Sequence, residues 1–271
     1  MKTIIIFFTF FVLAFSINAM DSRRMAVGEI GTALIGDVGT IEANAAGMTF
    51  RGEKEFLHFA VNSQLYSPKL NLGKFYNLNL QALYQSPFFA AGVSIKGLKF
   101  RNIYSKYNLN LSVAKAFFSQ ISIGLKVNFV YNTFSISGLN SNYGFDLSPS
   151  LLYNSSSRFF QIGIVAEKIY ASYKNAEAVL NFGSCFHFLP NLGINLDYQY
   201  NLQSFDKISL GAEALFFKDI ITLRGGIIEC QNVYGMGFGV GIQFQNFKLN
   251  YAVDMSPTVD VVNSFEFIFG I

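Results

Sequence analysis

The sequence predicts an all-β fold: a transmembrane, antiparallel, up-and-down β-barrel of about fourteen strands, preceded by a short helical or loop segment at the N-terminus. Three observations predict this fold class. Apolar and polar residues alternate along most of the chain. The alternating segments are each about ten residues long, which suits a tilted membrane-crossing strand. The chain is 51% hydrophobic and 17% aromatic, yet no later segment has the unbroken apolar length of a spanning helix.

The N-terminus is typical of a secretory signal peptide. Lys2 supplies a positive charge, residues 4–15 are almost entirely apolar, and the small residues from Ser16 to Ala19 offer a cleavage site. This apolar run is shorter than the ~20 residues that a spanning helix needs. We therefore expect three parts: a signal peptide over residues 1–19, a helical or loop segment over residues 20–52 and the barrel over residues 53–271.

The last quarter of the chain, from Asp206 to Ile271, shows the alternation most clearly. Between Met236 and Phe244 every second residue is large and apolar, and the residues between them are glycine or glutamine. A sheet with one such face needs an apolar partner on that side, either a second sheet or a membrane. Two stacked sheets with so many bulky residues would overfill a core ~10 Å thick. The pattern therefore favours the membrane barrel over a soluble sandwich.

The predicted strands are joined by short segments that carry turn residues, such as residues 154–157 and 245–246. Short connections favour antiparallel hairpins, and an even number of strands favours closure into an up-and-down barrel. The strands are expected at residues 54–65, 75–85, 88–97, 106–117, 120–131, 143–153, 158–168, 177–187, 191–201, 206–217, 219–228, 234–244, 246–254 and 261–271.

Polar residues on the face opposite the bulky one predict a wet lumen. We expect Glu213 and Arg224 to pair across neighbouring strands inside it, as a solvated ion pair that contributes only about 0 to 1 kcal/mol. The charged residues expected to line the lumen wall are Lys126, Asp197, Glu213, Arg224 and Glu266.

The sequence offers little for catalysis or for nucleic-acid binding. His58 and His187 lie far apart, and no G-x-S-x-G, H-E-x-x-H or paired-carboxylate motif occurs. We therefore predict that the protein is not an enzyme, with no catalytic residue, metal site or cofactor. Cys185 and Cys230 are expected to be free thiols rather than a disulfide. A net charge of +3 is too small to favour a nucleic-acid partner.

The stretch from Thr32 to Met48 carries a recognisable pattern. Its order T-A-L, Asp37, Asn44, then A-A-G-M resembles the N-terminal T-A-L-x-x-D-x-x-x-x-x-x-N-P-A-G-L/M pattern of the PorV/PorQ family of outer-membrane barrels, which are distant relatives of the FadL fatty-acid transporters. Near the C-terminus, similar elements occur in the family's order at residues 209–213, 223–226, 237–241 and 249–252. The chain departs from the family at Ala45 (usually Pro), Asn250 (usually Asp) and Ile271 (usually aromatic).

The resemblance implies a fourteen-stranded barrel in the outer membrane of a Gram-negative-type bacterium, with the N-terminal segment folded into the lumen. It implies a non-enzymatic role in type IX protein secretion or surface attachment, with outer-membrane lipid, secretion-system proteins or secreted cargo as partners. It leaves the oligomeric state open. The plug residues that it points to are Thr32, Asp37, Asn44 and Gly47.

Two other functions stay open at this point. One is a FadL-like channel for hydrophobic small molecules, and the other is a purely structural outer-membrane barrel. A channel predicts an apolar pocket beside the plug and a kinked strand that opens the wall to lipid. A sealed wall around a polar lumen would exclude such a channel.

Overall fold

The computed structural model describes residues 20–50, 56–67, 75–86, 89–100, 103–117, 119–135, 141–155, 159–173, 176–202, 206–256 and 260–271. The expected signal peptide, residues 1–19, lies outside these ranges. Among the described residues, no helix is long and apolar enough to cross a membrane.

The predicted strands are present, with ends that shift by a few residues. They are long because β-favouring residues alternate along them without interruption by helix signals. Their bounds are β1 (Phe56–Ser67), β2 (Phe75–Gln85), β3 (Phe89–Phe100), β4 (Tyr104–Phe117), β5 (Ile121–Phe134), β6 (Asn142–Asn154), β7 (Phe160–Glu167), β8 (Tyr170–Ala171), β9 (Val179–Leu189), β10 (Leu192–Asn201), β11 (Lys207–Phe216), β12 (Ile221–Cys230), β13 (Val233–Phe244), β14 (Phe247–Ser256) and β15 (Asp260–Gly270).

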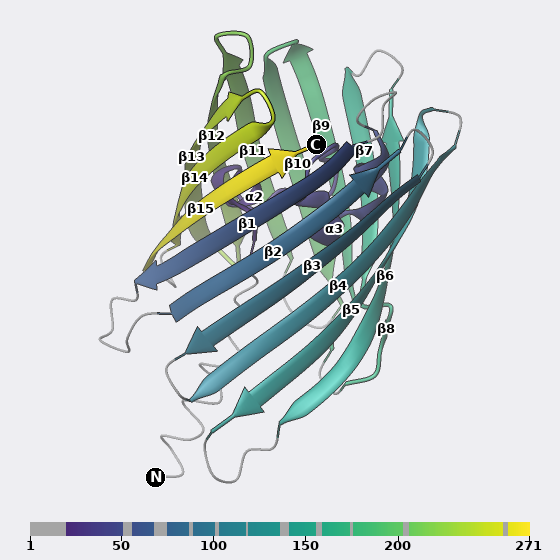
Figure 1. The fold of residues 1–271 in the computed structure, drawn as a ribbon, viewed down its shortest axis with the longest axis vertical. Coiled ribbons are helices and arrows are strands. Elements are labelled where there is room, and N and C mark those ends of the chain that lie inside the picture. Colours follow the sequence, from purple (N-terminus) through teal and green to yellow (C-terminus); the bar gives the residue numbers. More distant parts are fainter. Residues whose placement is uncertain are drawn as a thin grey trace.

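These strands form one antiparallel sheet that closes on itself (Figure 1). Each long strand pairs with its neighbours along the chain, and the ring closes where β1 pairs with β15. The two-residue β8 follows β7 on the same side of β6, so the ring contains 14 strands. The predicted up-and-down barrel of about fourteen strands is confirmed.

The two faces of the wall have opposite character. In β15, Phe265 and Phe267 are 59% and 41% exposed, whereas the residues between them, Ser264 and Glu266, are 0% and 3% exposed. The same alternation recurs around the ring. The bulky apolar residues therefore point outward, as in barrels that face lipid, and the polar residues point into the lumen.

The inner segment, residues 20–50, lies inside the ring (Figure 1, purple). It contains the short helices α2 (Ser22–Ala26), α3 (Thr40–Ala43) and the 3-10 helix η1 (Ala45–Thr49). Its apolar residues bury small patches of the wall, where Ile41 and Met48 pack with Leu83 and Ala114. The inner segment is thus held partly by apolar contacts in an otherwise polar lumen.

One strand of the wall is interrupted. Ser150 of β6 pairs with Val165 of β7, but Leu147 pairs with Tyr170 of β8. Two residues of β6, 148–149, therefore lie opposite four residues, 166–169, and the four-residue segment forms a bulge. Lys168 adopts a positive φ of 54° at the bulge. A β-bulge of this kind bends the strand and breaks the ladder.

Pro149 lies opposite the bulge. Along β6, even-numbered residues such as Asn154 donate toward the β5 side, whereas Ser155 donates to Phe160 at the start of β7. The amide of residue 149 would therefore point toward β7, and proline has no N–H to donate. The Ser148 hydroxyl instead accepts a hydrogen bond from the Lys168 N–H at 3.1 Å.

The interruption leaves part of the wall without strand pairing. The ladder between β7 and β9 ends at Glu167 and Val179. Beyond that point β8 pairs with β6 alone among the described residues. Outside this break, Ile169 and Tyr170 are 59% and 53% exposed. The strand predicted over residues 158–168 is present as β7, and the break in the wall lies just beyond its end, beside β8.

Candidate functional site

The interior of the barrel is the candidate site, and Glu42 of α3 is a centre of its polar contacts. Its carboxylate accepts hydrogen bonds from Asn79 at 3.0 Å and Ser94 at 2.5 Å, and it pairs with the Lys96 ammonium at 2.5 Å. Its backbone carbonyl accepts a hydrogen bond from Lys126 Nζ at 2.7 Å. Strands β2, β3 and β5 are therefore all fastened to one residue of the inner segment.

The groups that contact Glu42 stabilise its negative charge. Burial alone would raise the pKa of the Glu42 carboxyl, but the Lys96 ammonium and the Ser94 hydroxyl outweigh burial and hold that pKa below its ordinary value of 4.5. A carboxyl whose pKa is lowered on folding stabilises the folded state above its unfolded pKa. That contribution is lost as the pH falls through the folded pKa.

This linkage gives a pH prediction. We expect the difference in unfolding free energy between the wild type and Glu42→Gln to be constant from neutral pH down to about pH 4.5 and to shrink at lower pH. Denaturant unfolding of both proteins in the same detergent, at several pH values, measures the difference. Because other titrating groups are shared, they cancel in the comparison. A difference that grows as the pH falls would contradict the lowered pKa.

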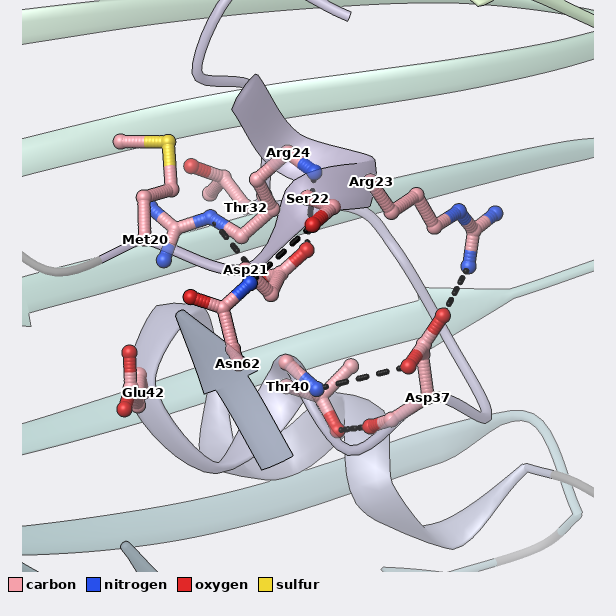
Figure 2. Close-up of polar contacts among 12 residues, drawn as sticks. Met20, Asp21, Ser22, Arg23, Arg24, Thr32, Asp37, Thr40, Glu42 and Asn62 are labelled. Carbon is pink, nitrogen blue, oxygen red and sulfur yellow. Dashed lines mark hydrogen bonds and ion pairs between the residues drawn. The ribbon is translucent and has the colours of Figure 1, made fainter. Parts of the chain in front are cut away.

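On the opposite wall, Arg23 of α2 is the central residue. Its Nε and Nη2 donate to the two oxygens of Glu213, each at 3.0 Å, and its Nη1 pairs with Asp37 at 3.2 Å. Figure 2 shows Arg23 reaching toward Asp37, with Asp37 beside Thr40. Burial alone would lower the pKa of Arg23, but the two carboxylates raise it, so this arginine is charged. One side chain thus connects α2, the turn before α3 and β11.

The Arg23 contact continues into the wall. Glu213 also accepts a hydrogen bond from Arg224 Nε at 2.6 Å, and these two residues are directly opposite each other on β11 and β12. Arg224 donates to Asn250 at 3.1 Å, and Asn250 donates to Glu266 at 2.8 Å. The side chain of Arg224 is 1% exposed. The expected solvated Glu213–Arg224 pair is therefore a buried pair within a larger network, because the inner segment excludes water from it.

A third contact holds the stretch around Thr32. Asp197 of β10 accepts hydrogen bonds from the backbone N–H groups of Gly31 at 2.8 Å and Thr32 at 2.9 Å. The Thr32 carbonyl accepts a hydrogen bond from the Asn44 amide, at 2.5 Å. A side chain on Gly163 of β7 would collide with that carbonyl. Glycine at this position therefore lets the backbone of the inner segment approach the wall closely.

The remaining expected residues are placed as follows. Asn44 caps η1 by accepting from the Ala46 N–H at 3.0 Å. Gly47 accepts a backbone hydrogen bond from Gly36 at 3.0 Å, and a side chain there would strike the Leu34 carbonyl. Of the five expected wall residues, three bond directly to the inner segment. They are Lys126, Asp197 and Glu213, while Arg224 and Glu266 bond to other wall residues.

Sequence reasoning missed three of the central residues, Arg23, Glu42 and Lys96. Lys96 had a usable signal, because it lies two residues after Ser94 on the polar face of an expected strand. Arg23 and Glu42 lie in a segment without alternation, and no spacing rule connects either of them to a distant strand.

The histidines and cysteines bring no reactive group together. The Cys185 sulfur lies 3.8 Å from Nδ1 of His187, two residues along the same strand. Both cysteines are free thiols, and Cys185 is buried. Within the described ranges, no three metal-binding side chains of His, Cys, Asp or Glu type gather at one place.

Among the described residues, cavities adjoin the inner segment at two places that bear on function. The larger, of about 440 Å³, opens at the end of the barrel that carries the C-terminus and the start of β1, and its lining includes Arg23, Asp37 and Lys248. The smaller, of about 100 Å³, has a polar lining that includes Glu167 at the wall break and Asp197. Of the two features expected of a channel, the kinked strand is therefore present, whereas the cavity next to it is polar rather than apolar.

Comparison with known proteins finds the same fold in solved structures but no match at the level of sequence. No protein-family model matches the chain, and no curated protein matches its sequence. Solved structures do match. The toluene transporter TbuX of Ralstonia pickettii has a TM-score of 0.72 at 13% identity, over 94% of this chain and 98% of that one. The monoaromatic hydrocarbon channel CymD has a TM-score of 0.72 at 13% identity, over 95% and 99%.

A FadL homologue of Pseudomonas aeruginosa matches with a TM-score of 0.65 at 9% identity, over 94% of this chain and 97% of that one. These neighbours are transporters and channels rather than enzymes. At such low identity, what the chain shares with them is the fold, a closed antiparallel β-barrel.

Proposed function

We propose that this protein is an outer-membrane channel that lets small hydrophobic molecules pass sideways through its wall. The single observation that carries the proposal is the break in the wall between β8 and β9, beside the interrupted strand. The shared fold supports it, because similar barrels include a toluene transporter and a monoaromatic hydrocarbon channel. The C-terminal end, which has the tight turns from Leu189 to Leu192 and from Phe244 to Phe247, faces the periplasm.

The inner segment acts as a plug in this proposal. Contacts from Glu42, Arg23 and Thr32 fasten it to both sides of the wall, and it blocks a straight path along the barrel axis. A hydrophobic solute is not stabilised in the polar lumen, because burial of its apolar surface away from water is what lowers its free energy. The break offers it a short way from the lumen into the hydrocarbon layer. Its outer rim is apolar at Ile169 and Tyr170.

A deletion tests the proposal. Removing Lys168 and Ile169 takes away the two residues by which the β8 pairing departs from the β7 register, so the ladder along β6 becomes continuous. We expect this deletion to reduce uptake of radiolabelled toluene by cells about tenfold or more, because the wall closes. The matched control is Lys168→Gly, which keeps the bulge because glycine adopts a positive φ readily. Equal uptake by the deletion variant and the wild type would refute the sideways path.

A role in secretion or surface attachment is the second proposal. Its support is the motif from Thr32 to Met48, whose polar residues Asp37 and Asn44 both make contacts within the barrel interior. Among the similar solved structures, TbuX is named as a toluene transporter and CymD as a hydrocarbon channel, and neither name mentions a secretion partner. Export of surface proteins by a deletion strain tests this role. Unchanged export together with lost toluene uptake favours the channel.

A further inference from the structure

The cavity of about 440 Å³ at the C-terminal end has a lining of two kinds. Its apolar lining includes Ile35, Phe56 and Ile268. Its charged lining consists of Arg23, Asp37 and Lys248. Ligand pockets commonly have this size and combine an apolar wall with a few fixed polar groups.

The three charged residues are not equivalent. Each of the three guanidinium nitrogens of Arg23 already donates to Glu213 or Asp37. Lys248 is different. Within the described ranges its only partner is Asp37, at 3.9 Å, which is too long for a hydrogen bond. Its side chain is 21% exposed. The cavity therefore contains an ammonium group whose three N–H donors lack an acceptor among the described residues.

An ammonium beside an apolar wall favours an anion that brings its own apolar body. The charge of that anion is limited by Asp37, whose carboxylate lies 3.9 Å from the ammonium and repels a second negative charge. A monoanion balances the single positive charge of Lys248, whereas a phosphate dianion brings one negative charge more than Lys248 can balance. The ring of Phe56 suits a flat aromatic body, because aromatic faces and edges stack favourably.

From this arrangement we propose that the periplasmic cavity binds a small aromatic monocarboxylate, with the carboxylate on Lys248 and the ring against Phe56 and Ile268. This site goes beyond the channel proposal. It lies at the C-terminal end and not at the wall break, and its occupation requires no passage of solute through the barrel.

Calorimetric titration of the detergent-purified full-length barrel with benzoate tests the site, and benzyl alcohol is the neutral probe of nearly the same shape. We expect saturable binding of benzoate and binding of benzyl alcohol that is at least about tenfold weaker. Lys248→Gln should weaken benzoate binding about tenfold or more, and Lys248→Arg should restore most of it because the charge returns. Lys115→Gln removes a lysine on the outer wall, over the ring of Phe117, and should change nothing.

A second measurement guards against misfolding of the Lys248 variant. The chain contains no tryptophan, so Gln243→Trp places a single fluorescent reporter in the cavity lining. Benzoate should change its emission saturably, and adding Lys248→Gln should abolish that change while the far-ultraviolet circular dichroism of the barrel is unaltered. Absent benzoate binding, equal binding of benzyl alcohol, or full binding in the folded Lys248→Gln variant would each overturn the proposal. Toluene uptake is measured separately, so failure of this site and failure of the channel are distinguishable.

Discussion

Replacement of Arg23 by glutamine is expected to loosen the inner segment more than any other single change within it. The substitution removes the cation that joins Glu213 and Asp37, which have side chains only 16% and 10% exposed. Breaking a buried ion pair by removing one partner costs about 3–5 kcal/mol, because the remaining charge is left desolvated. Glu213 retains Arg224 as a partner, so we expect the lower end of that range.

Two measurements check this result. Denaturant unfolding in detergent reports the loss of stability, and limited proteolysis reports exposure of residues 20–50. Arg23→Lys is the informative companion, because lysine retains the charge but not the planar pair of donors that meets both oxygens of Glu213. The loss of stability in Arg23→Lys should be smaller than in Arg23→Gln but still measurable against the wild type. A proteolysis rate for Arg23→Gln equal to that of the wild type would show that α2 is held by its apolar contacts alone.

Replacement of Phe267 by arginine is expected to impair assembly of the barrel into the membrane. The Phe267 side chain is 41% exposed on the outer face of β15 and pairs with Leu249 and Val61 on the neighbouring strands. An arginine on the lipid face costs about 2–4 kcal/mol at the bilayer midplane. Heat-modifiable migration on gels and recovery in the outer-membrane fraction measure assembly.

The neighbouring residue supplies the control. Glu266 points into the lumen and is 3% exposed, and Glu266→Gln retains its size and its ability to accept from Asn250. We expect Glu266→Gln to assemble like the wild type. Similar defects in both variants would mean that the two faces of β15 are assigned wrongly.

Much of the wall could be predicted because strand periodicity is a local property. Leu196 and Asp197 fall on opposite faces by counting alone, and the structure places them so. The break beside β7 was not predicted, although Pro149 in an expected strand was a visible signal that the ladder lacks a donor there. Whether such a position bends the wall depends on the chain opposite it, which local counting does not include.

The interior contacts could be predicted only in part. Alternation placed Asp197 and Glu213 in the lumen and predicted the pair of Glu213 with Arg224. It could not identify their partners in the inner segment, because those partners lie more than a hundred residues away. The resemblance to a known family drew attention to Thr32, Asp37 and Asn44. Arg23, which pairs with both Glu213 and Asp37, precedes that motif and carries no pattern of its own.

The closing seam of the ring gives the N-terminal helix α2 a meaning for assembly. Ser22 of α2 shares a hydrogen bond with Ser264 of β15 at 2.8 Å and accepts one from Asn62 of β1 at 3.1 Å. Asn62 in turn donates to Ser264 at 2.9 Å. The first and last strands therefore meet over a residue that is synthesised before either of them. A slip of one residue at the seam would turn Asn62 or Ser264 toward lipid. Only the correct register therefore lets Ser22, Asn62 and Ser264 all form their hydrogen bonds. In this way α2, although it is made first, favours the correct pairing of the first and last strands.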